Sequence, residues 1–135
     1  MKTIHRDQSD SEKAASAKGR NSRIKGHNYE REIVNRLKAL GFTAERGLQM
    51  RGGKRIADVT VFDKYGAVMY HIECKKGKQP NGKNALDQAI REKRPGAMPI
   101  AVCCKEPTEP FGFREETVTM KLGDWLELIL MVHNG

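Results

Sequence analysis

The stretch Val68-Met-Tyr-His-Ile-Glu-Cys-Lys75 decides the fold, because its composition and the turn residues on either side predict a β-strand. Side chains alternate between the two faces of a strand, so His71, Glu73 and Lys75 share one face. A carboxylate binds a hard cation, and a nearby ammonium group can orient or help to deprotonate a water molecule. An E-x-K pair is also a frequent surface ion pair, so the chemistry depends on what lies beside it.

An acid in the preceding strand strengthens the chemical interpretation. Asp58 lies in the otherwise apolar run Ile56–Phe62, and the turn Asp63–Gly66 joins this run to the next strand in a predicted hairpin. The hairpin brings Asp58 near Glu73. An unpaired buried charge is costly, so Asp58 needs a partner. That partner is either a cation shared with Glu73 or a salt bridge to Lys75 or an arginine.

A third acid comes from a predicted helix at residues 27–40. Glu30 has apolar residues three, four and seven positions later, which puts it on the stripe that faces the sheet. Glu32 has polar residues at the same offsets and is therefore predicted on the solvent-exposed face of the helix. An acid near a helix N-terminus is also favoured by the helix dipole, and this alternative stays open. The apolar residues that follow Glu30 are Ile33, Val34 and Leu37.

Three inward carboxylates and one lysine are typical of a hard-cation site. Oxygen ligands suit Mg²⁺, with Mn²⁺ as a substitute, and the backbone carbonyl of Cys74 can add a further ligand. The chemistry that such a site favours is phosphodiester hydrolysis, with Lys75 positioning the nucleophile or stabilising the transition state. The predicted catalytic residues are Glu30, Asp58, Glu73 and Lys75.

The other segments complete an α/β pattern, in which a mixed β-sheet is flanked by helices. Residues 1–22 are polar and predict a flexible basic N-terminal arm, and 23–135 predict a single domain. Asn84 is expected to cap a helix at about 84–94, and Asp124 to cap a terminal helix. The remaining predicted strands are 42–46, 99–104 and 117–121, and the predicted loops are 49–55, 77–83 and 105–114.

Charge favours a polyanionic partner. The 135 residues carry 25 Lys and Arg against 17 acids, for a net charge of +8, and the positive residues of the folded part are clustered. Such clusters are typical of phosphate contacts with DNA. The predicted DNA-binding residues are Lys25, Arg46, Arg51, Lys54, Arg55, Lys76 and Lys78.

The chain has no apolar run of the roughly 20 residues that cross a bilayer, and its first residues have no apolar stretch typical of a secretory signal. Three cysteines, two of them adjacent, argue against a disulfide framework and predict reduced, mostly buried thiols in a cytoplasmic protein.

The segments Lys25-Gly-His-Asn-Tyr-Glu-Arg-Glu-Ile-Val34, Ala57-Asp-Val59 and Ile72-Glu-Cys-Lys75 resemble the archaeal-type Holliday junction resolvases of the PD-(D/E)xK nuclease superfamily. The resemblance implies a restriction-endonuclease-like core, Mg²⁺, and a homodimer that makes symmetric paired nicks in four-way junctions. Its metal-site residues correspond to the four already named. Ala57 replaces the usual proline, and the ending after about 107 resembles phage-encoded members, which would act in the host cytoplasm.

Four further residues or segments carry predictions: Gln88, His71, Tyr29 and the terminal helix. Gln88 lies on the helix after the E-x-K strand, where a glutamine assists the site in many nucleases of this superfamily, and a solvated glutamine is the alternative. His71 shares the catalytic face and could contact phosphate, but a surface position is expected for it, whereas Tyr29 is expected in the core. The terminal helix is apolar on several sides, which predicts a dimer contact besides core packing. Another nuclease of this superfamily, restriction-like or for repair, and a non-catalytic DNA-binding protein remain the alternative functions.

Overall fold

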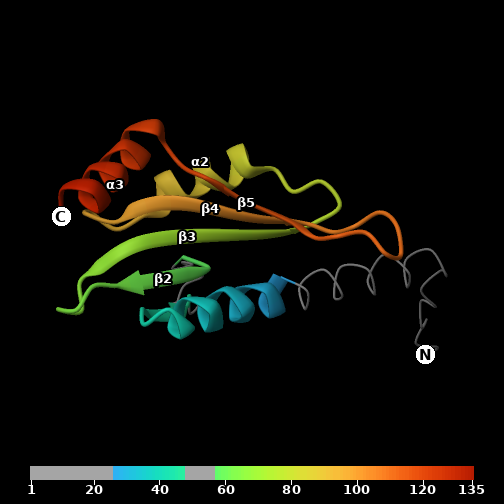
Figure 1. Cartoon of the computed structure of the whole chain (residues 1–135), viewed down its shortest axis with the longest axis horizontal. Coiled ribbons are helices and arrows are strands. Elements are labelled where there is room, and N and C mark those ends of the chain that lie inside the picture. The colour runs from blue at the N-terminus through green and yellow to red at the C-terminus, as the bar shows by residue number, and fades with distance from the viewer. Residues whose placement is uncertain (1–25, 48–56) are drawn as a thin grey trace, which may run out of the picture.

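The computed structural model describes residues 26–47 and 57–135, and it confirms the α/β fold with one mixed sheet (Figure 1). The sheet has five strands in the order β1-β2-β3-β4-β5, and only β3 and β4 run parallel. A first helix covers residues 26–39 of the described part. The other elements are β1 (Thr43–Arg46), β2 (Val59–Phe62), β3 (Val68–Gly77), α2 (Gly82–Glu92), β4 (Met98–Lys105), β5 (Glu115–Thr119) and α3 (Leu122–Asn134).

The hairpin between β2 and β3 sets the register of the central strands. Asp63 Oδ1 accepts hydrogen bonds from the backbone N–H groups of Tyr65 and Ala67, both at 2.9 Å, and Gly66 takes the positive φ of 84° that the turn needs. Thr60 then lies opposite His71, and the preceding residue lies opposite Ile72. One further step of the same register places Asp58 opposite Glu73.

Helix α2 connects β3 to β4, because two parallel strands cannot be joined by a tight turn. Ala85 and Leu86 of α2 pack on Ala101 of β4, on one face of the sheet. The helix begins at Gly82, about two residues earlier than predicted. Asn81 is the cap, three residues before Asn84, and its side-chain oxygen accepts from the backbone N–H of Asn84 at 3.0 Å. The prediction that Asn84 caps this helix was therefore wrong.

The first helix covers the other face of the sheet and makes the larger core. Tyr29, Ile33 and Val34 are buried against the apolar side chains of β2 and β3. The predicted core position of Tyr29 is confirmed, and so is the apolar stripe of Ile33, Val34 and Leu37 that faces the sheet. Gly41 ends the helix with a φ of 95°, and the N–H of Phe42 donates to the carbonyl of Leu37 at 3.1 Å, the pattern of a Schellman cap.

The C-terminal part differs from the prediction in its boundaries. Strand β5 begins at Glu115 rather than two residues later, and Lys121 rather than Asp124 occupies the N-cap of α3. Asp124 lies in the first turn, where its negative charge interacts favourably with the helix dipole. No residue of α3 is buried, and its apolar side chains are exposed except for the half-buried Leu128 and Ile129.

The predicted arm at 1–22, the loop at 49–55, and Lys25, Arg51, Lys54 and Arg55 lie outside the described residues. Within the described ranges, no helix has the length and apolar character that a membrane crossing demands.

Candidate active site

Two acids lie together where the chain enters β2: Asp58, directly before this strand, and Glu73, in the middle of β3. The backbone N–H of Cys74 donates to Asp58 Oδ2 at 2.9 Å, which holds Asp58 beside the E-x-K strand. Asp58 is 5% exposed and Glu73 is 1% exposed, so both carboxylates are shielded from water. Their proximity accords with the hairpin register, because Asp58 directly precedes Val59, which pairs with Ile72.

Glu30 reaches the same site from the first helix. It is buried, and Arg46 Nε donates to Glu30 Oε2 at 3.3 Å. Burial raises the pKa of Glu30, the nearby Asp58 charge raises it further, and Arg46 and His27 lower it. Glu32 lies on the other side of the helix, as predicted, where it is paired with Arg114. The structure thus brings together the three acids that the sequence singled out.

The electrostatics of Glu73 show how crowded this site is. Burial raises the pKa of Glu73 to about 7; the hydrogen bond with His71 opposes this rise, and the neighbouring Asp58 adds to it. Glu73 Oε1 lies 2.9 Å from His71 Nε2. Glu73 Oε2 is fully buried and has no hydrogen-bond partner among the described residues. A buried oxygen without a donor is costly, and a cation beside it would offset that cost.

The backbone of Cys74 faces the same side as the acids. In a strand, the N–H and C=O of one residue point the same way, as the paired hydrogen bonds of an antiparallel ladder require. The Cys74 N–H points at Asp58, so the Cys74 carbonyl points to the same side of β3. The β2–β3 pairing does not extend past Val59, so β2 does not pair with Cys74. The Cys74 thiol is buried with the core, and burial raises its pKa.

Lys75 shares the strand face of Glu73 and is half-buried. It lies opposite Cys103 of β4, and its charge lowers the pKa of that thiol, which burial raises. Within 26–47 and 57–135, Lys75 takes part in no ion pair. All three cysteines are buried and free, as the sequence predicted.

His71 was misjudged from the sequence. It is 3% exposed rather than at the surface, and it bonds to Glu73. The alternation along β3 already placed the two side chains on one face, but it did not show that α2 covers that face. Gln88 of α2 donates to both carboxylate oxygens of Glu92, at 3.5 and 3.4 Å, rather than to the three acids. Glu92, His71 and Glu73 have side-chain ligand atoms within 4.8 Å of one another.

Three of the residues predicted to bind DNA are described by the structure: Arg46, Lys76 and Lys78. Arg46 pairs with Glu30, so it also stabilises a site carboxylate. Lys76 lies with its ammonium nitrogen 5.9 Å from the centre of the Tyr29 ring, and Lys78 is exposed at the end of the strand region.

A polar network anchors the first helix to β5. Arg114 makes a bidentate pair with Glu32, at 2.9 and 3.0 Å. Glu116 accepts from the Tyr29 hydroxyl at 2.8 Å and from Arg36 at 2.7 Å. These contacts fix the helix that carries Glu30 against a strand more than 80 residues away in the chain.

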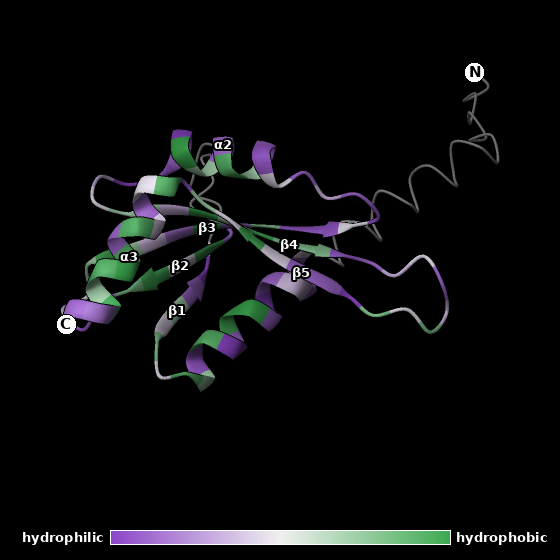
Figure 2. Ribbon diagram, turned by 45° about the horizontal axis from the view of Figure 1, so that its top comes forward, coloured by the Kyte–Doolittle hydropathy of each residue, from purple (hydrophilic) through white to green (hydrophobic). Residues whose placement is uncertain are grey.

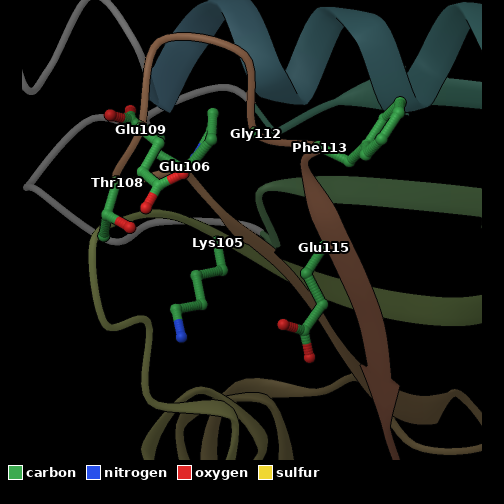
Figure 3. A pocket seen from close by; sticks show the side chains of 8 residues that line it. Lys105, Glu106, Thr108, Glu109, Gly112, Phe113 and Glu115 are labelled. Atoms are coloured by element: carbon green, nitrogen blue, oxygen red, sulfur yellow. The ribbon is translucent and has the colours of Figure 1, made fainter.

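A surface hollow of about 220 Å³ lies between the end of β4 and the start of β5 (Figure 3). Its lining includes Lys105 and Glu115, which face each other across the strand pair. None of the three site acids lines it, so it is separate from the candidate active site.

Comparison with known families decides the class of protein. The family model described as archaeal Holliday junction resolvase (Hjc) matches residues 21–88. The chain belongs to this family. No curated protein and no solved structure matches the chain significantly.

Membership in the resolvase family confirms the resemblance that the sequence indicated. It implies Holliday junction resolvase activity, and resolvases of this family are metal-dependent endonucleases. The five-stranded mixed sheet with its helices is consistent with their restriction-endonuclease-like fold. The matched segment contains Glu30, Asp58, Glu73, Lys75 and Gln88, and it ends before β4, so the C-terminal third of this resolvase lies outside the match.

Proposed function

We propose that this chain resolves four-way DNA junctions by Mg²⁺-dependent hydrolysis, with Glu30, Asp58, Glu73 and Lys75 as the catalytic residues. The metal ligands in this proposal are the three carboxylates and the Cys74 backbone carbonyl. The single nuclease domain that carries them begins near residue 23. The observation that carries the proposal is the buried oxygen Glu73 Oε2, which has no hydrogen-bond partner among the described residues, in a carboxylate whose pKa the neighbouring Asp58 raises.

The donor set fits a hard divalent cation. Mg²⁺ prefers oxygen ligands and is usually held through one or two carboxylates, which Asp58 and Glu73 can supply. The Asp58 charge disfavours ionisation of both Glu30 and Glu73, which is repulsion that a cation relieves. Mn²⁺ shares this preference for oxygen ligands and is expected to substitute.

The chain's own groups then have separate roles. When bound, Mg²⁺ supplies charge stabilisation on the phosphate and lowers the pKa of a coordinated water. Lys75 projects from the same strand face as Glu73, where its ammonium positions the attacking water or contacts the developing negative charge. The Cys74 N–H holds Asp58 in a fixed orientation beside Glu73.

Phosphate contacts are assigned to basic residues around the acids. Lys76 and Lys78 follow Lys75 at the end of β3, and Arg46 lies beside Glu30. Lys25, Arg51, Lys54 and Arg55 are proposed to add contacts, as the sequence predicts. Three free buried cysteines accord with a reducing compartment, so we place the enzyme in the cytoplasm, of the host if a phage encodes it.

A homodimer is part of the proposal, because paired nicks in a two-fold symmetric junction need two sites. Large apolar side chains of α3 and β5 are exposed, and Figure 2 shows hydrophobic residues along α3. A surface hollow of about 440 Å³ lies between the two elements, lined in part by Val118, Leu122 and Trp125. A patch of this kind usually marks a protein interface, and a second copy is the occupant that the symmetric reaction requires.

The test incubates the purified chain with a four-way junction, a duplex, a flap and single-stranded DNA, with and without Mg²⁺. We expect metal-dependent cutting that strongly favours the junction. Asp58→Asn should bind the junction without cutting it, and Glu45→Gln, which changes an exposed acid of β1, should cut like the wild type. Equal cutting of all four substrates would contradict the resolvase assignment, and full activity of Asp58→Asn would contradict the site.

A further inference from the structure

The side chain of His71 is placed to hold the catalytic carboxylate of Glu73. Both residues are almost fully buried, at 3% and 1% exposed, and they share one face of β3. His71 Nε2 lies 2.9 Å from Glu73 Oε1. An ionised carboxylate only accepts hydrogen bonds, so the imidazole donates through Nε2 in the metal-ready state.

The two oxygens of Glu73 are therefore unequal. Oε1 is taken by His71, whereas Oε2 is buried with no hydrogen-bond partner among the residues described. Carboxylates that ligate metals are commonly hydrogen-bonded through the oxygen that does not bind the ion, and this contact fixes their orientation. The histidine bond leaves one defined oxygen for the cation.

Helix α2 supports this arrangement from outside. Glu92 has a carboxylate oxygen within 4.8 Å of the ligand atoms of His71 and Glu73, and Gln88 donates to Glu92. Glu92 is exposed, whereas His71 and Glu73 are buried. His71 Nε2 bonds to Glu73 Oε1, so this nitrogen could not bind a cation at the cluster and keep that hydrogen bond.

Resting on the proposed function, we propose that His71 is a positioning residue, which orients Glu73 so that Oε2 is its metal-binding oxygen. Glu92 and Gln88 shield the imidazole from the side of α2 and are not ligands. This gives the glutamine of α2 an indirect role through Glu92 and His71, rather than a contact with the three acids.

The test measures Mn²⁺ binding to the full chain without DNA, by electron paramagnetic resonance of free Mn²⁺, together with single-turnover junction cleavage at varied Mn²⁺. Four variants are compared: His71→Leu, His71→Gln, Glu92→Gln and Ile72→Val. Ile72 is the matched control, because it is a buried neighbour in β3 whose side chain lies on the opposite sheet face. Thermal unfolding and metal-free junction binding are recorded for each.

We expect His71→Leu to weaken Mn²⁺ binding about 10- to 100-fold, the usual effect of losing a group that orients a ligand. The Mn²⁺ concentration for half-maximal cleavage should rise by the same factor, with metal-free junction binding unchanged. His71→Gln should recover most of the affinity, since its amide also donates. Glu92→Gln should keep the wild-type number of bound ions, and Ile72→Val should lose thermal stability without losing Mn²⁺ affinity.

Three results would overturn the inference. Wild-type Mn²⁺ affinity in His71→Leu would remove the role, and equal weakening in Ile72→Val would show a general loss of stability. Loss of one bound ion in both His71→Leu and Glu92→Gln would make His71 a ligand of a second ion. Failure of the proposed function is distinct: there Asp58→Asn would bind Mn²⁺ as tightly as the wild type.

Discussion

The backbone N–H of Cys74 donates to Asp58 Oδ2 across 2.9 Å, so the acid directly before β2 is anchored to the strand that carries Glu73 and Lys75. This bond depends on an oxygen acceptor and not on a negative charge. Catalysis in the proposed site depends on the charge. The two requirements can be separated by substitution at one position.

Asp58→Asn should fold as stably as the wild type in the absence of metal, because it keeps an oxygen for the Cys74 N–H and removes repulsion toward Glu73. Asp58→Ala should lose about 1 to 3 kcal/mol of unfolding free energy, because it leaves the buried N–H unpaired. Both variants should be inactive. Chemical denaturation of the two variants checks the difference, and equal stabilities would show that the bond contributes little.

Metal binding should depend on pH through Glu73. Its folded pKa of about 7 lies above the ordinary value of 4.5, so the metal-free folded state retains a proton that the unfolded state releases. The metal-free protein should therefore lose stability as the pH rises from about 4.5 to about 7. The cation needs the ionised form, so its affinity should rise over the same window and be about tenfold weaker at pH 6 than on the plateau above pH 7.

The measurement is the Mg²⁺ concentration that gives half-maximal cleavage between pH 5.5 and 8.5, paired with metal-free unfolding over the same range. Glu30, whose pKa is also raised, should steepen the dependence. A Mg²⁺ requirement that does not change with pH would contradict the buried, crowded state of these carboxylates.

The anchoring of the first helix by Arg114 should affect both stability and rate. Arg114→Ala removes the bidentate pair with Glu32 and the cation that lies 5.6 Å from the centre of the Tyr29 ring. The pair is partly exposed, so we expect a loss of about 1 kcal/mol in unfolding free energy. Cleavage should slow more than junction binding weakens, because the helix carries Glu30. Unchanged kcat in Arg114→Ala would show that the rest of the core suffices to hold the helix.

Dimer formation should depend on the exposed apolar surface of α3. Trp125 is 49% exposed in the single chain, and Trp125→Glu places a charge in the proposed interface. We expect the variant to sediment as a monomer in analytical ultracentrifugation and to lose paired nicking. Glu127→Gln, on the same helix, is the control and should remain a dimer. A wild-type chain that sediments as a monomer at micromolar concentration would contradict the dimer.

Much of the site follows from local sequence rules. The turn at Asp63–Gly66 fixes which residue of β2 faces Glu73, and the spacing of Ile33, Val34 and Leu37 selects Glu30 over Glu32. Both inferences need only the periods of a strand and a helix. They placed three acids in one site before any tertiary contact was known.

The features of the site that could not be predicted from the sequence depend on contacts between segments far apart in the chain. The burial of His71 requires α2 to cover one sheet face, and the pairing of Arg46 with Glu30 requires β1 to lie beside the first helix. The cap of α2 was misplaced because Asn81 and Asn84 are both good capping residues three positions apart. Only the extended backbone of Asn81, with φ −97° and ψ 98°, decides between them.

The most direct test of the central claim is single-turnover cleavage of a four-way junction in which each strand is labelled in turn. We predict symmetric nicks in two opposing strands with Mg²⁺, none in a chelator, and none with Glu73→Gln, although that variant still binds the junction. Cleavage that persists in the chelator, or wild-type cleavage by Glu73→Gln, would contradict it.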